Sequence, residues 1–185
     1  FRYLQDALQE AYNGCRIYVK NGIYYPDESM NGSMENSREA SFQINAGISV
    51  YGGLSGVENP DDVFLLENRD LEANQTILSG DIDGDDSNID GNYIAETTED
   101  IQGSNAYHVV TLNNAILDGF TITAGFADDG SNVTTNSFDI HAYNEEGGRG
   151  GGITIGDGAA TISNCVISGN KAKKDGGGIY SSNST

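Results

Sequence analysis

The sequence has few of the residues that mark disulfide-rich, membrane-spanning or nucleic-acid-binding proteins. It holds only 2 Cys and 2 Pro among 185 residues, and 9 Lys and Arg stand against 28 Asp and Glu. Two cysteines are too few for a disulfide framework. No apolar run approaches the roughly 18 residues of a membrane helix, so we expect no transmembrane segment. The formal net charge of −19 excludes nucleic acid as a partner, because that binding needs Lys and Arg to face phosphates.

The residues that are abundant indicate a strand-and-turn protein. The chain is 37% apolar and contains 25 Gly, and its recurring Ile, Val, Leu and Tyr exclude a disordered chain. Dense carboxylates favour cations as partners, above all Ca²⁺. The alternative interpretation is that the high negative charge only keeps the protein soluble.

Local patterns predict one helix followed by short strands. Residues 1–13 have the apolar spacing of a short amphipathic helix, and Gly14 follows as a stop signal. Apolar and polar residues alternate over 15–20, which is the period of a strand. Further strand candidates, separated by Gly, Asn and Asp, are 42–44, 48–51, 76–79, 108–112, 117–123, 152–155, 161–167 and 178–180.

Internal repeats connect these strands. The stretch 150–153 (GGGI) recurs at an offset of 26 as 176–179, and 110–112 (VTL) matches 153–155 (ITI) at an offset of 43. The stretch 76–80 aligns with 121–125 and then 166–170, each time at an offset of 45, which places Ile77, Ile122 and Ile167 in one file. A unit of this size cannot bury its apolar face alone, whereas stacked parallel coils about 4.8 Å apart can.

We therefore expect a single all-β domain over 1–185, a parallel β-helix whose first coil is capped by the helix of 1–13 and whose coils occupy 15–185. Two insertion loops, 81–106 and 126–149, leave one corner of the solenoid and carry 13 of the 28 acidic residues. No capping element follows residue 176, so we expect the chain to be the N-terminal part of a longer solenoid. Cys15 and Cys165 fall several coils apart, beyond disulfide reach.

The motifs resemble those of a known superfamily. The matching stretches are 4–25, 50–53, 76–80, 108–110, 117–122, 151–153, 162–170 and 177–179. In these the chain resembles the pectin-lyase-like right-handed parallel β-helix superfamily, and more narrowly bacterial surface proteins with polymorphic-outer-membrane-protein-type repeats. The resemblance implies a right-handed solenoid located outside the cell or on its outer surface. The superfamily includes lyases, hydrolases, adhesins and scaffolds, so the fold leaves the function open.

One segment has the spacing of a metal-binding loop. Carboxylates alternate in DIDGDDSNID, residues 81–90, as they do at positions 1, 3 and 5 of a calcium loop. The match to an EF-hand is incomplete, because Asp86 stands where that loop has Gly and Asn92 where it has Glu. A solvated acidic loop is the alternative. The candidate Ca²⁺ ligands are Asp81, Asp83, Asp85, Asp86 and Asp90, and we expect no organic cofactor.

No pattern selects a catalytic residue. Exposed candidates are Asp118, Arg149, Asp157, Lys171, Lys173 and Lys174, and the three lysines can equally form ion pairs with the acidic loops. Four tyrosines have positions from which they could stack on sugars, with core or rim packing as the alternative: Tyr18, Tyr24, Tyr25 and Tyr51.

Two hypotheses of function remain open. The first is a secreted or cell-surface adhesin or binding scaffold that takes a polysaccharide, or a glycan or protein of a cell surface, with Ca²⁺ as a candidate cofactor. The second is a polysaccharide lyase or glycoside hydrolase whose groove lies partly outside this segment. The absence of a catalytic signature favours the first.

Overall fold

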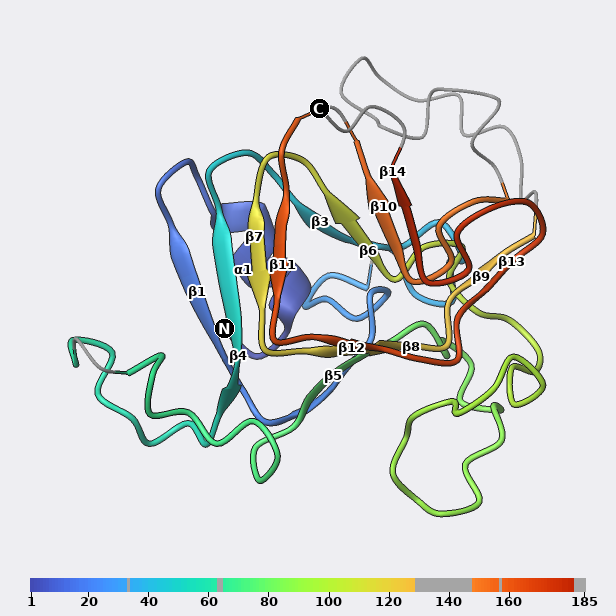
Figure 1. Ribbon diagram of the computed structural model, residues 1–185, viewed down its shortest axis with the longest axis horizontal. Coiled ribbons are helices and arrows are strands. Elements are labelled where there is room, and N and C mark those ends of the chain that lie inside the picture. Colours follow the sequence, from blue (N-terminus) through green and yellow to red (C-terminus); the bar gives the residue numbers. More distant parts are fainter. Residues whose placement is uncertain (33, 63–64, 129–147, 157, 182–185) are drawn as a thin grey trace.

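The chain forms parallel β-sheets with one short helix, as a computed structural model shows (Figure 1). The structure describes residues 1–32, 34–62, 65–128, 148–156 and 158–181. Within these residues, no helix has the length and apolar character needed to cross a membrane. The expected all-β character is confirmed.

Among the described residues, three four-stranded parallel sheets and one strand pair are formed. The first sheet contains β1 (Arg16–Lys20), β4 (Ser49–Leu54), β7 (Ile116–Asp118) and β11 (Thr161–Ser163). The second contains β2 (Gly22–Tyr24), β5 (Thr76–Ser79), β8 (Thr121–Thr123) and β12 (Val166–Ile167). The third contains β3 (Phe42–Ile44), β6 (Val110–Leu112), β10 (Ile153–Ile155) and β14 (Ile179–Ser181), and β9 (Phe126–Ala127) pairs with β13 (Lys171–Ala172).

The chain visits the three sheets in turn. β1, β2 and β3 belong to the first, second and third sheets, and β4 returns to the first, where it pairs with β1 in parallel. Each later circuit adds one strand to every sheet, so strands far apart in sequence lie side by side (Figure 1). Stacking of this kind buries the apolar face that no single circuit could bury.

The pairing registers confirm most of the sequence repeats. Ile153 pairs with Ile179 at the offset of 26, and Val110 pairs with Ile153 at the offset of 43. Ile122 pairs with Ile167 at the offset of 45.

The first member of the 45-residue alignment is wrong by one residue. Leu78, not Ile77, pairs with Ile122, while Ile77 pairs with Thr121. Side chains alternate across a strand, so a slip of one residue exchanges the inner and outer faces. Leu78 is fully buried and belongs to the central apolar cluster together with Ile122, whereas Ile77 does not.

The helix packs against the apolar core, as expected of a cap. α1 (Leu4–Glu10) contacts β3, the edge strand of the third sheet. Leu4 and Leu8 are buried in the same cluster as Phe42 and Leu117. Each fully buried aliphatic side chain contributes about 1.5–3 kcal/mol to stability.

Two of the predicted strands are each divided at a corner. Within 117–123, Gly119 has φ +85° and separates β7 from β8; within 161–167, Asn164 has φ +51° and separates β11 from β12. Glycine adopts such left-handed conformations freely and asparagine tolerates them, which lets the chain turn from one sheet to the next. The short strands β2, β9 and β13 had no distinct signal in the apolar pattern.

Several expectations concern particular residues. Cys15 and Cys165 are free, as expected. Most of the second insertion loop, residues 129–147, lies outside the described residues, as does the candidate Asp157. β5, β8 and β12 are neighbours in the second sheet, so the segments that follow these three strands all leave the same sheet.

Candidate functional site

Three carboxylates converge where the loop of residues 81–106 leaves the second sheet. Asp81, Asp85 and Asp86 each place a carboxylate oxygen so that the three atoms lie within 4.8 Å of one another. We call these three residues the Asp81 cluster. β5 ends at Ser79, and a backbone bridge between Asp81 and Asn105 closes the loop (yellow-green in Figure 1) at its base.

Backbone hydrogen bonds fix Asp81. Its Oδ1 accepts from the N–H of Gly84 at 2.9 Å and of Asp85 at 3.1 Å. The sequence DIDGDD thus folds back on its first carboxylate, a turn that Asp favours because its short side chain bonds nearby backbone N–H groups.

Asp86 is held from the far end of the same loop. Its Oδ1 accepts from the Gln102 N–H at 2.6 Å, and its Oδ2 accepts from the Asn105 side-chain Nδ2 at 2.8 Å. Residues 16 to 19 positions apart in sequence therefore meet at this carboxylate.

Asp83 borders the cluster and Asp90 lies apart from it. Asp83 Oδ2 accepts from the Ser104 N–H at 2.9 Å. A Cβ on Gly103 would lie 2.7 Å from that oxygen and 2.3 Å from Asp85 Oδ2, so glycine is what allows this segment to approach the two carboxylates. The exposed Asp90 accepts instead from the backbone and side-chain nitrogens of Asn92.

The carboxyl groups of this region are costly to ionise. Burial raises the pKa of Asp81, and hydrogen bonds from Asp85 and Gly84 only partly oppose this. Burial also raises the pKa of Asp86 to about 6, against lowering by Gln102 and Asn105 and with further raising by Asp81 and Asp85. The charged groups that act on both pKa values are other carboxylates, an arrangement that a cation would relieve.

The Asp86→Asn substitution is expected to stabilise the cation-free protein near neutral pH. The pKa of Asp86 is about 6 in the fold against an ordinary 3.8, so the folded state binds more protons between these values and stability falls as pH rises through that window. Urea unfolding in EDTA should show the gain at about pH 7.5 and little change at about pH 3.5.

The exposed Asp90→Asn substitution, in the same loop, is the control and should give no such gain in stability. If Asp86→Asn were no more stable than the unmodified protein at the higher pH, the Asp86 carboxylate would not be desolvated.

A polar depression adjoins the cluster. It has a volume of about 550 Å³, and we call it the acidic hollow. Its lining residues are Tyr3, Tyr25, Asp27, Glu28, Ser29, Gly32, Glu35, Asn36, Asp81, Ile82, Asp83 and Gly84. A second depression of about 100 Å³ shares Tyr25, Asp81 and Gly84 with it.

Electrostatics in the acidic hollow resemble those of the cluster. Burial raises the pKa of Asp27, which accepts a hydrogen bond from the Asn36 N–H at 2.9 Å. Burial is also the main cause that raises the pKa of Glu28. The pKa of Tyr25 rises to about 12 through burial and then through the charge of Asp81, so its hydroxyl stays protonated and able to donate a hydrogen bond.

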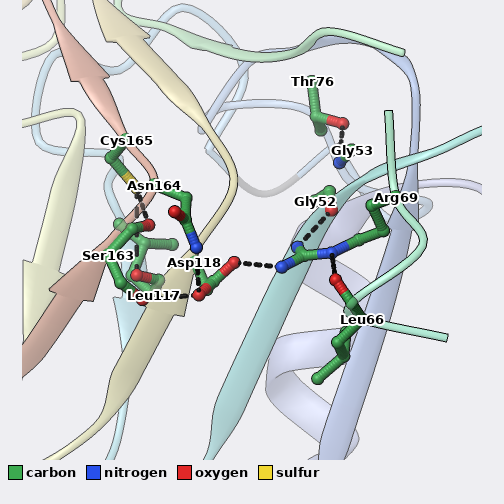
Figure 2. Close-up of polar contacts among 10 residues, drawn as sticks. All are labelled: Gly52, Gly53, Leu66, Arg69, Thr76, Leu117, Asp118, Ser163, Asn164 and Cys165. Atoms are coloured by element: carbon green, nitrogen blue, oxygen red, sulfur yellow. Dashed lines mark hydrogen bonds and ion pairs between the residues drawn. The ribbon is translucent and has the colours of Figure 1, made fainter. Parts of the chain in front are cut away.

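The carboxylate of the catalytic candidate Asp118 is held by contacts with neighbouring side chains (Figure 2). It forms an ion pair with Arg69, whose side chain is 4% exposed against 13% for Asp118. Ser163 and Asn164 also donate to its Oδ2. Burial raises the pKa of Asp118, but the hydrogen bonds from Ser163 and Arg69 outweigh it and hold the pKa below the ordinary value.

The basic candidates have partners of their own. Arg149 pairs with Asp175 at 3.0 Å and donates to the Tyr180 hydroxyl. The Lys171 ammonium lies 4.7 Å from the centre of the Phe126 ring. Lys173 and Lys174 follow β13 and are exposed. Asp118 and Lys171 thus belong to different sheets and have different partners.

Of the four predicted tyrosines, Tyr25 lines the acidic hollow. Tyr18 and Tyr51 pair in register and stack on each other with ring centres 5.7 Å apart. Tyr24 packs against the apolar core and donates its hydroxyl to the Lys20 carbonyl. No sequence pattern pointed to Tyr3, Asp27 or Asn105, because their approach to this region depends on how the chain folds and how the loop of residues 81–106 closes.

Comparisons with protein-family models, with curated proteins and with solved structures give no match.

Proposed function

We propose that this chain is a right-handed parallel β-helix that serves as a secreted or cell-surface scaffold for binding carbohydrate. Three sheets visited in turn by parallel strands support the solenoid. The right hand follows the general preference of parallel crossover connections. The resemblance of the repeats to those of bacterial surface proteins supports the location.

The acidic hollow is the observation that carries the function. Carboxylates of Asp27, Glu28 and Asp81 offer hydrogen-bond acceptors there, and Tyr3 and Tyr25 offer aromatic surface. Sugars present hydroxyl donors together with apolar faces, and a depression of several hundred cubic ångströms with a few fixed polar groups suits such a ligand.

The charge of the acidic hollow favours neutral or amine-bearing sugars over uronic acids. A uronate carboxylate placed beside Asp27, Glu28 and Asp81 would meet like charges, which disfavours binding. A glycan array with the purified chain should therefore give signals for neutral or amino sugars and none for polyuronates.

Replacing Tyr25 with alanine is expected to weaken binding of the best array glycan by about 2- to 13-fold, since an aromatic contact is worth roughly 0.5–1.5 kcal/mol beyond its buried area. Titration calorimetry measures the change. Tyr12, which is 74% exposed and outside the acidic hollow, is the matched control, and Tyr12→Ala should bind as the unmodified chain does. Equal losses in both variants would contradict this site.

The same glycans test the alternative of a polysaccharide lyase or glycoside hydrolase. An enzyme would release shortened or unsaturated products on incubation, whereas a scaffold returns the glycan intact. The ion pair that occupies Asp118 supports the scaffold.

A further inference from the structure

We infer that the Asp81 cluster, together with the side-chain oxygen of Asn105, forms a Ca²⁺ site that ties the two ends of the loop of residues 81–106 together. This inference concerns a metal, and it stands independently of carbohydrate binding.

The first observation is the spacing of the carboxylate oxygens. Ca²⁺ binds oxygen at 2.3–2.6 Å, so ligands on opposite sides of one ion are about 4.6–5.2 Å apart. The oxygens of Asp81, Asp85 and Asp86 lie within 4.8 Å of one another, and a single ion can therefore contact all three. Mg²⁺ requires shorter contacts and stricter octahedral geometry, so we expect it to bind more weakly.

The second observation is an unpaired buried oxygen beside the cluster. Asn105 is fully buried, and its Oδ1 has no hydrogen-bond partner among the described residues. Its Nδ2 donates to Asp86 Oδ2 and to the Ala124 carbonyl, each at 2.8 Å. The unpaired Oδ1 and the Nδ2 that donates to Asp86 are bonded to the same carbon atom of the Asn105 side chain.

An unpaired buried oxygen is a cost to the fold unless a ligand satisfies it. Leaving a buried acceptor without a partner costs about 1–3 kcal/mol, and an amide oxygen is among the groups that coordinate Ca²⁺. Three carboxylates and one amide oxygen supply four of the six to eight oxygens that Ca²⁺ takes, and water completes such sets.

The site differs from the one that sequence spacing predicts. Asp90 bonds Asn92 and lies apart, while Asn105, 24 positions after Asp81, takes part. Because Asp86 and Asn105 come from the two ends of one loop, a bound ion would hold that loop against the second sheet.

Calorimetric titration of CaCl₂ into the 185-residue chain, without glycan, tests the site. We expect one ion per chain with a dissociation constant of about 10⁻⁴–10⁻³ M, as in extracellular calcium modules, and weaker binding of MgCl₂. Asp86→Asn and Asp85→Asn should each weaken Ca²⁺ binding by at least about tenfold, since even groups that only orient metal ligands are worth 10–100-fold. Asp85 is exposed, so its variant tests the same site without altering a partly buried side chain.

Asp90→Asn is the matched control, with the same change of charge in the same loop. It should bind Ca²⁺ as the unmodified chain does. The inference is overturned if the unmodified chain binds no Ca²⁺, or if Asp90→Asn loses affinity as much as the other two, which would indicate diffuse attraction. Absence of glycan binding leaves this result untouched, because no glycan is present in the titration.

Discussion

Replacing Asp118 with alanine is expected to lower the free energy of unfolding by about 3–5 kcal/mol, the usual cost of leaving one partner of a buried ion pair unpaired. The Arg69 guanidinium is 4% exposed and would keep its charge after the substitution. It would keep its hydrogen bonds to the carbonyls of Gly52 and Leu66 (Figure 2) and its position 6.0 Å from the Tyr51 ring centre, none of which neutralises it. Urea unfolding followed by circular dichroism measures the change.

Arg69 lies in the connection between β4 and β5, so the ion pair fastens that connection to the outer side of the first sheet. Glu67→Ala is the control, because Glu67 is an exposed acidic residue two positions from Arg69. Its effect should stay within about 0.5 kcal/mol. Similar losses in both variants would mean that net charge, not the buried pair, determines the result.

Replacing Leu117 with alanine is expected to lower the free energy of unfolding by about 3–5 kcal/mol through loss of buried area and the cavity that remains. Leu117 is fully buried, with 0% of its surface accessible to solvent. It pairs with Val50 on one side and with Ile162 on the other. The neighbouring strands restrict collapse around the cavity, because β7 is paired with β4 on one side and with β11 on the other.

Val166→Ala tests whether burial is the cause. Val166 is also a branched aliphatic residue in a strand, but it is 58% exposed. We expect a change below about 1 kcal/mol by the same urea measurement. If Val166→Ala lowered the free energy of unfolding as much as Leu117→Ala, burial of Leu117 in the core would not be the cause of its effect.

Much of the fold was predictable from the sequence because repeats constrain it strongly. The offsets of 26 and 43 fixed which residues pair in the third sheet, and the spacing of Leu4 and Leu8 fixed the helix that covers the core. The register of β5 was not predictable in this way. Ile77 and Leu78 are adjacent and both apolar, so only packing selects which one faces Ile122.

The candidate site was likewise predictable from the sequence only in part. Alternating aspartates after β5 identified Asp81, Asp83, Asp85, Asp86 and Asp90 as candidate ligands, and the structure brings Asp81, Asp85 and Asp86 together. Asp90 has the same residue type and a plausible spacing, but Asn92 holds its carboxylate elsewhere. Asn105 could not be found from spacing, since its approach depends on how a long loop closes.

The sequence by itself determined that the strands are short, that residues of the third sheet recur at offsets of 26 and 43, and that acidic residues gather in two insertions. Those properties follow from periodicity and composition, which are local along the chain. Only the tertiary structure decided that Asp118 pairs with Arg69, that Tyr25 and Asp27 share a hollow with Asp81, and that Asn105 lies beside Asp86. Each of these contacts joins residues from separate circuits or loop ends, and their meeting depends on the packing of the whole molecule.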